Sequence, residues 1–313
     1  MKLGLMTDSV SHLPLDATLD LAAELDLDYV EFATGNWSQA PHLALDELIG
    51  SAPARRNLQA KLAERRLRIS ALTCSGNPLH PGPSGAEHDA VTRKTIELAA
   101  LLGVDRVVMM SGLPGGPGDR NPNWITVSWP RDATEVLAWQ WESAVLPYWT
   151  NLAAFAGRHG IQKLCLELHG QQIVYNVPTL VRLREAVGPM IGANLDPSHL
   201  IWMGADPIAV VEALGETIYH VHAKDTRING GSAVRTTLET LSLLTDTPES
   251  RAWNYVTLGT GSGQQFWADF CSALARVGYD DVLSIEHEDV AVDPVEGVRS
   301  SVDLLLRVGP PRR

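Results

Sequence analysis

The chain has 313 residues, of which 45% are hydrophobic, and a formal net charge of −12 at pH 7. This length can bury a large core, and an α/β barrel commonly takes it as one domain. The acidic balance argues against nucleic acid or an anionic membrane as a partner, because phosphate binding needs clustered Lys and Arg. No apolar run approaches the length of a membrane span.

The N-terminal residues and the spacing of the cysteines indicate the cellular compartment. Residues 2–6 are strand-like and lack the apolar core of a signal peptide. Cys74, Cys165 and Cys271 lie far apart without a CxxC pair, which suggests neither a disulfide framework nor a cysteine zinc site. We therefore expect a protein of the reducing cytoplasm.

Strand-like and helix-like segments alternate along the whole chain. Short apolar runs predict eight strands, at 2–6, 28–33, 68–73, 105–110, 163–168, 190–195, 218–223 and 282–286. Amphipathic stretches predict helices at 16–26, 54–66, 87–103, 133–159, 178–187, 206–215, 264–277 and 294–307. Eight such units favour an α/β fold of the closed (β/α)₈ TIM-barrel type over 1–308, with a flexible tail at 309–313.

Two long insertions follow predicted strands. They occupy 111–132, after the fourth strand, and 224–263, after the seventh. The catalytic face of a barrel lies at the carboxyl ends of its strands, so both insertions belong to that face. We expect binding loops, lids or subunit contacts there.

Four apolar runs in the second half of the chain carry a potential metal ligand at or near their ends. These ligands are Glu167, Asp196, His222 and Glu286. If the strands are parallel neighbours, their carboxyl ends converge on one point. Carboxylate oxygens and an imidazole nitrogen would then surround a single divalent cation.

Each ligand also has a plainer interpretation. Glu167 could be salt-bridged at a strand end, and Asp196 could cap the turn at Pro197. His222 shares a strand face with His220, and either could be a packed core residue. The four positions together favour the metal interpretation, since an unpaired buried carboxylate is costly.

Further polar residues surround this point in the predicted barrel. His169 shares a strand face with Glu167, and His199 lies three residues after Asp196 in a turn that can fold back. Lys224 and Arg227 follow the seventh strand and are placed to meet substrate oxygens.

Loops after other strands supply three more candidate substrate contacts. His80 lies in the Gly- and Pro-rich loop 75–81, which could equally be a surface turn. Trp37 and Trp124 lie in loops between strands and helices, where their rings could pack against a sugar or simply close the barrel mouth.

The ligand pattern resembles the sugar isomerase/epimerase superfamily with a xylose isomerase-like barrel. The likeness covers nearly the whole chain and is most specific at Glu167, the Asp196-x-x-His199 pair, the His222-x-Lys-Asp run and Glu286. In ketose 3-epimerases the corresponding Glu, Asp, His and Glu bind Mn²⁺ or a similar ion (Mg²⁺ or Co²⁺ would also suit). The resemblance implies that the two Glu act as acid and base beside a substrate carbonyl, through an enolate that the cation stabilises.

One departure leaves a second chemistry open. Residues 169–172 (His-Gly-Gln-Gln) replace a region where ketose 3-epimerases carry another Glu. The insertion after strand 4 resembles that of large subunits that cleave 3-oxo-glycosides, including C-glycosides, beside a small partner subunit. There the same enolate would expel the anomeric group, with His169 or His80 handling a proton.

Two further possibilities stay open from the sequence. An inosose-type dehydratase would use the same enolate chemistry, and a barrel that binds a sugar without turnover is also possible. The expected ligand is a keto-sugar or keto-glycoside. The expected assembly is a homo-oligomer or a complex with a small accessory subunit.

Overall fold

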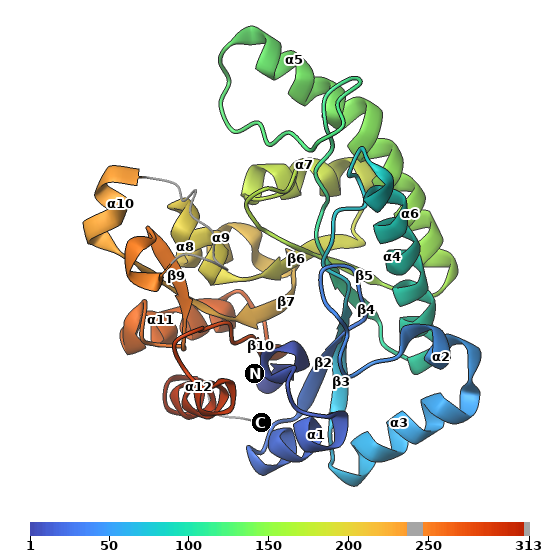
Figure 1. Cartoon of the computed structure of the whole chain (residues 1–313), viewed down its shortest axis with the longest axis vertical. Helices are drawn as coiled ribbons and strands as arrows, with labels where there is room; N and C mark the ends of the chain where they lie inside the picture. The colour runs from blue at the N-terminus through green and yellow to red at the C-terminus, as the bar shows by residue number, and fades with distance from the viewer. Residues whose placement is uncertain (237–246, 310–313) are drawn as a thin grey trace.

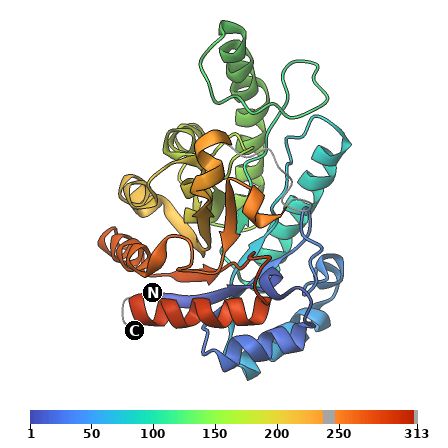
Figure 2. The ribbon, with the colours of Figure 1, turned by 60° about the vertical axis from the view of Figure 1, so that its left-hand side comes forward.

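The computed structural model describes residues 1–236 and 247–309. Eight parallel strands close into a barrel in the order β1-β10-β7-β6-β5-β4-β3-β2, which confirms the predicted (β/α)₈ fold (Figures 1 and 2). The strands are β1 (Lys2–Met6), β2 (Tyr29–Ala33), β3 (Arg68–Thr73), β4 (Arg106–Met109), β5 (Lys163–Glu167), β6 (Ile191–Leu195), β7 (Ile218–Ala223) and β10 (Val282–Ile285).

Helices surround the barrel and follow its strands along the chain (Figure 1). Those that overlap a predicted helix are α1 (Leu15–Glu24), α3 (Ala52–Glu64), α4 (Pro83–Leu102), α5 (Arg131–Trp139), α6 (Leu146–Arg158), α7 (Val177–Val187), α9 (Pro207–Leu214), α11 (Gly263–Arg276) and α12 (Pro294–Val308). All of them except α5 bury an apolar face, and Trp149 of α6 and Trp267 of α11 are completely buried. The core therefore lies between the barrel and its helical layer.

The fourth predicted helix, 133–159, is divided in three. A π-helical stretch (Gln140–Val145) joins α5 to α6. Pro147 follows this wide turn and has no backbone N–H to donate, which disfavours regular α-helical bonding there. No residue of α5 is buried, and Figure 1 shows α5 extending beyond the barrel at the top.

Several short elements were not expected from the sequence. They are α2 (Leu45–Gly50), α8 (Pro197–Met203), α10 (Gly230–Thr236) and the antiparallel strands β8 (Asp225–Ile228) and β9 (Trp253–Val256). The hairpin strands and α10 lie within the predicted insertion 224–263, and the two strands contain the Thr, Ile, Trp and Tyr that strands favour. The described part of the insertion therefore contains a two-stranded sheet and the short helix α10.

Three further features concern the end of the chain, membrane-spanning helices and the cysteines. Of the predicted tail 309–313, only Gly309 belongs to the described residues. Within residues 1–236 and 247–309, we find no helix whose length and apolarity would allow it to cross a membrane. The three cysteines are buried and free.

Candidate active site

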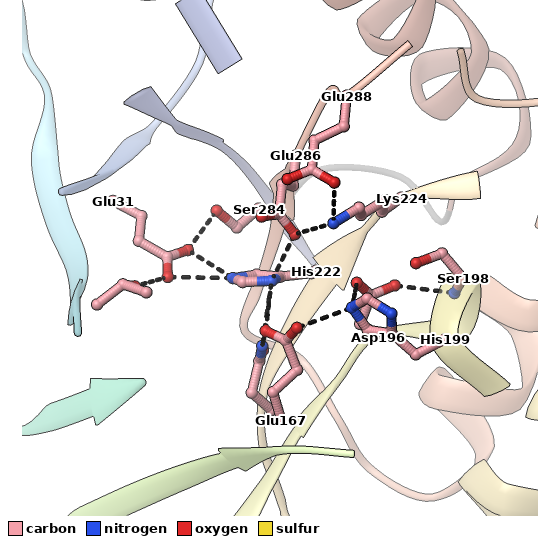
Figure 3. Close-up of polar contacts among 12 residues, drawn as sticks. Glu31, Glu167, Asp196, Ser198, His199, His222, Lys224, Ser284, Glu286 and Glu288 are labelled. Carbon is pink, nitrogen blue, oxygen red and sulfur yellow. Dashed lines mark hydrogen bonds and ion pairs between the residues drawn. The ribbon is translucent and has the colours of Figure 1, made fainter. Parts of the chain in front are cut away.

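The structure brings the four predicted metal ligands together at one end of the barrel (Figure 3). Glu167 is the last residue of β5, Glu286 follows β10, and His222 lies in β7. His222 Nδ1 is 3.0 Å from Glu286 Oε2 and 3.3 Å from Glu167 Oε2. Asp196, directly after β6, reaches the cluster through His199, whose Nε2 is 3.1 Å from Asp196 Oδ2 and 2.8 Å from Glu167 Oε1.

The cluster consists of two overlapping groups that share Glu167. One contains Glu167, His222 and Glu286, and the other contains Glu167, Asp196 and His199. Within each group the candidate ligand atoms lie within 4.8 Å of one another, and no single group among the described residues contains all four predicted ligands. His199, expected only to contact substrate, thus joins the candidate ligands.

The local sequence explains where Asp196 and His199 point. Asp196 caps α8 by accepting a hydrogen bond from the Ser198 N–H at 2.8 Å, and Pro197 starts the helix. The alternative prediction that Asp196 caps the turn at Pro197 is therefore confirmed. The cap occupies only Oδ1, while Oδ2 of the same carboxylate faces His199.

Two carboxylate oxygens in the cluster are buried without a hydrogen bond. They are Asp196 Oδ2 and Glu286 Oε2, although imidazole or ammonium nitrogens lie 3.0–3.3 Å away. Leaving a buried charged acceptor without a donor is costly. Oxygen ligands beside imidazole nitrogens are a donor set that suits a divalent cation such as Mn²⁺ or Zn²⁺, so these residues fit one.

The charges of the cluster are set by mutual contact. Burial alone would raise the pKa of Glu167, but His199 and His222 lower it well below its usual value. Burial would likewise lower the pKa of His199, but Asp196 and Glu167 raise it to about 9. Glu167 is thus ionised near neutral pH, as a carboxylate metal ligand must be.

Lys224 lies at the rim of the cluster, as expected from its position after β7. Its ammonium group is 2.7 Å from Glu288 and 3.3 Å from Glu286, and lies 4.3 Å from the centre of the Tyr255 ring. Burial would lower the pKa of Lys224, but the two carboxylates raise it well above its usual value. Lys224 is therefore a charged but already paired group.

Two residues of the site were missed from the sequence. Tyr255 lies on β9, and its hydroxyl is 3.0 Å from His199 Nδ1. Nothing in the pattern predicted this hairpin, so no signal pointed to Tyr255. Glu31 lies on β2, completely buried, and contacts His222 Nε2 at 3.1 Å. Glu31 interrupts an apolar run (29–33) as the predicted ligands do, and the same criterion could have found it.

The pKa of Glu31 is set by the same two histidines that it contacts. Burial would raise it, but His222 and His220 lower it well below its usual value. Glu31 is therefore a carboxylate held inside the barrel by imidazole contacts.

A cavity of about 310 Å³ opens beside the cluster. Among the residues that line it are Glu167, His169, His199, Lys224, Tyr255, Glu286, Glu288 and Trp37. Four of the predicted substrate or proton-handling residues (His169, His199, Lys224 and Trp37) therefore face the space that a substrate would occupy.

Three predicted substrate contacts do not line this cavity. His80 Nδ1 accepts a hydrogen bond from the Gly82 N–H, just before α4. Arg227 is exposed on β8, and Trp124 packs edge-on against the ring of Tyr175. Their roles in binding stay predictions.

His169 stands beside His199 in the cavity wall. The two ring centroids are 4.0 Å apart, and His169 Nδ1 contacts the carbonyl of Gly170. Burial and the charge of His199 lower the pKa of His169 to about 4. His169 is therefore a neutral imidazole at pH 7, in the form that can accept a proton.

Enzymes with a (β/α)₈ barrel carry their active sites at the carboxyl ends of the strands, which is where this chain gathers carboxylates and imidazoles around a cavity. The chain belongs to the xylose isomerase-like TIM barrel family, whose model matches residues 19–308. It is 51% identical over 309 residues to a Bacillus subtilis (strain 168) protein, "Uncharacterized protein YfiH", covering 97% of this chain and 98% of that one.

Solved structures share the fold at lower sequence identity. The probable 3-DHS dehydratase AsbF of Bacillus anthracis is 16% identical, with a TM-score of 0.69 and coverage of 98% and 99% of the two chains. An IOLI protein with a bound zinc atom is 20% identical (TM-score 0.65, 98% of both chains). A D-tagatose 3-epimerase-like protein is also 20% identical (TM-score 0.63, 98% of both). The fold thus occurs with epimerase-like and dehydratase members.

Proposed function

We propose that this chain is a divalent-metal-dependent sugar isomerase or epimerase that moves a proton next to a carbonyl group. The observation that carries the proposal is that two carboxylates, Glu167 and Glu286, contact the same nitrogen of His222 and line the same cavity. Membership of the xylose isomerase-like family supports it. So does the fold shared with an epimerase-like protein.

The cation would be held by Glu167, Asp196, His222 and Glu286. Mn²⁺ is the ion we propose, and Mg²⁺ or Co²⁺ would suit the same ligands. When bound, such an ion polarises a carbonyl group and makes the neighbouring C–H bond more acidic. The zinc atom bound in the IOLI structure supports a divalent cation in this fold.

The two glutamates would share the proton transfer. The Glu286 side chain is 16% exposed and that of Glu167 only 4%, so Glu286 is the one that meets substrate and solvent more readily. We assign removal of the proton to Glu286 and its return from the other side to Glu167. His199, held by the Tyr255 hydroxyl, would hydrogen-bond a substrate oxygen.

The substrate that fits this cavity is an uncharged keto-sugar. Three glutamates (Glu167, Glu286 and Glu288) line it, and the charge of Lys224 is already paired with two of them. No free cation remains there for a phosphate among the described lining residues. Trp37, half exposed at the wall, offers an aromatic face to the C–H side of a sugar.

A second candidate reaction is cleavage of a 3-oxo-glycoside. The observation that favours it is His169, a neutral imidazole in the cavity wall beside His199. His169 would take the C2 proton, the electron pair would form a C1–C2 double bond, and the anomeric substituent would leave with its bonding pair. We also propose that the chain acts in the cytoplasm. We propose that it forms a homo-oligomer or a complex with a small partner subunit.

Solvent exchange tests the proposal. Ketopentoses, ketohexoses and a 3-keto-glucoside are incubated with the enzyme and Mn²⁺ in D₂O, and the products are identified by NMR. We expect deuterium beside the carbonyl of at least one sugar whose substituents all remain attached. Glu167→Gln and Glu286→Gln should each slow exchange by about 10²-fold or more. Glu296→Gln, an exposed carboxylate on α12, is the matched control and should exchange normally.

The other outcomes separate the alternatives. Release of the anomeric group from the 3-keto-glucoside selects the cleavage reaction. If the wild-type protein exchanges deuterium into no sugar, and Glu286→Gln still binds sugar, catalysis is contradicted. The chain would then be a sugar-binding barrel.

A further inference from the structure

Glu31 is the centre of a hydrogen-bond network inside the barrel (Figure 3). The side chain is completely buried, and every donor to it comes from another strand. His220 Nε2 lies 2.8 Å from Oε2 and His222 Nε2 lies 3.1 Å from Oε1, both from β7. Ser284 of β10 donates to Oε2 at 2.6 Å, and Thr73 of β3 donates to Oε1.

The contact decides which nitrogen of His222 carries a hydrogen. An ionised carboxylate only accepts hydrogen bonds, so His222 must present N–H from Nε2 to Glu31. A neutral imidazole has one N–H, so Nδ1 then carries the free lone pair. Nδ1 is the atom that faces Glu167 and Glu286.

The same residues could in principle form a separate cation site, since Glu31, His220 and His222 have candidate ligand atoms within 4.8 Å. Both oxygens of Glu31 already accept hydrogen bonds from Ser284, Thr73 or the histidines. Among the four carboxylates Glu31, Glu167, Asp196 and Glu286, the oxygens without a hydrogen bond belong to Asp196 and Glu286. This pattern favours a supporting network over a second cation.

We propose that Glu31 is a positioning residue, which fixes the ring and the tautomer of His222 so that Nδ1 is presented to a cation held with Glu167 and Glu286. The proposal rests on the cation site of the proposed function. It assigns Glu31 no contact with substrate. Carboxylates behind metal-binding histidines act in this way generally, and their loss costs about 10- to 100-fold in metal affinity.

Metal titration of the whole chain tests the assignment. Chelator-treated protein is titrated with Mn²⁺ by calorimetry, as wild type, Glu31→Gln and Ser284→Ala. In Glu31→Gln an amide NH₂ meets groups that already donate, so we expect Mn²⁺ affinity to fall about 10- to 100-fold. Ser284→Ala removes one donor to Glu31 but keeps its contact with His222, and should bind nearly as wild type. Equal affinity of Glu31→Gln and wild type overturns the proposal.

A second measurement does not depend on the variant folding. In wild-type protein with ¹⁵N-labelled histidine and Zn²⁺ as a diamagnetic ion, the nitrogen shifts of His222 report its tautomer. We expect N–H at Nε2, and N–H at Nδ1 overturns the proposal. If wild type binds ions tightly and Glu31→Gln does too, only the role of Glu31 fails. If wild type binds no divalent ion, the proposed function fails with it.

Discussion

Glu167 shows how single side chains build this site. Its Oε2 accepts a hydrogen bond from Asn194 Nδ2 at 3.0 Å, and its two oxygens also contact His199 and His222. A carboxylate held from three sides has little freedom, so its geometry is preorganised for a cation or substrate. The position of Glu167 at a strand end and its proximity to His222 and His199 were predicted from the sequence. Its hydrogen bond with Asn194 was not, because that contact depends on how β6 is registered beside β5.

His199 gives the metal-free protein a pH-dependent stability. Its pKa in the fold, about 9, is above the value near 6.5 of an exposed histidine. The folded state therefore binds the extra proton more tightly, and this stabilisation is complete below pH 6.5 and lost as the pH rises through 9. We expect the free energy of unfolding of chelator-treated protein to fall between pH 6.5 and 9.5, by up to about 3 kcal/mol from this group.

Urea unfolding at a series of pH values measures this dependence. His199→Asn removes the titrating group and is less stable throughout, but it should show a smaller decrease over this pH range. Identical pH dependence in wild type and His199→Asn would contradict the account.

At the scale of elements, the β8–β9 hairpin is attached to the barrel through Asp225. This buried carboxylate accepts hydrogen bonds from the N–H groups of Thr226, Gly259 and Ser262 at 2.8–3.2 Å, and from the Trp267 ring N–H at 3.2 Å. One side chain thus joins β8, the loop after β9 and helix α11. The hairpin carries Tyr255, so its attachment also places a wall of the cavity.

We expect Asp225→Ala to destabilise the protein by about 3 kcal/mol or more, because several buried donors lose a charged acceptor. Asp269→Ala, an exposed carboxylate on α11, is the control and should stay within about 0.5 kcal/mol of wild type. Urea unfolding measures both, and amide hydrogen exchange of β9 reports loosening of the hairpin. Equal stability of the two variants would contradict this role.

Element prediction succeeded where the apolar pattern was long and regular. The eight barrel strands and the helices from α1 to α12 that overlap predicted spans all carry an apolar face, which the period reveals. The hairpin and α8 were missed because they are short and depend on tertiary contacts such as those of Asp225. The π-helical stretch before Pro147 was also not predicted, because the spacing of apolar residues does not distinguish a π-helical turn from an α-helical one.

For the whole molecule, closure of the barrel explains why residues far apart in the sequence form one site. Strand β10 pairs with both β1 and β7, which brings Glu286 beside His222 and places β2, with Glu31, across the barrel interior. Alternating strands and helices were enough to predict this convergence. The paths of the loops could not be predicted from the sequence. Of three loop residues predicted to contact substrate, Trp37 lines the cavity, whereas His80 and Arg227 do not.

The central claim is that the strand ends hold one divalent cation. Chelator-treated protein is exposed to Mn²⁺, freed of excess metal by gel filtration and analysed for metal by elemental mass spectrometry. We expect one equivalent of Mn²⁺ per chain in wild type and in the surface control Glu296→Gln, and a clearly substoichiometric amount in Glu167→Gln/Asp196→Asn. No bound metal in wild type, or a full equivalent retained by the double variant, would contradict the claim.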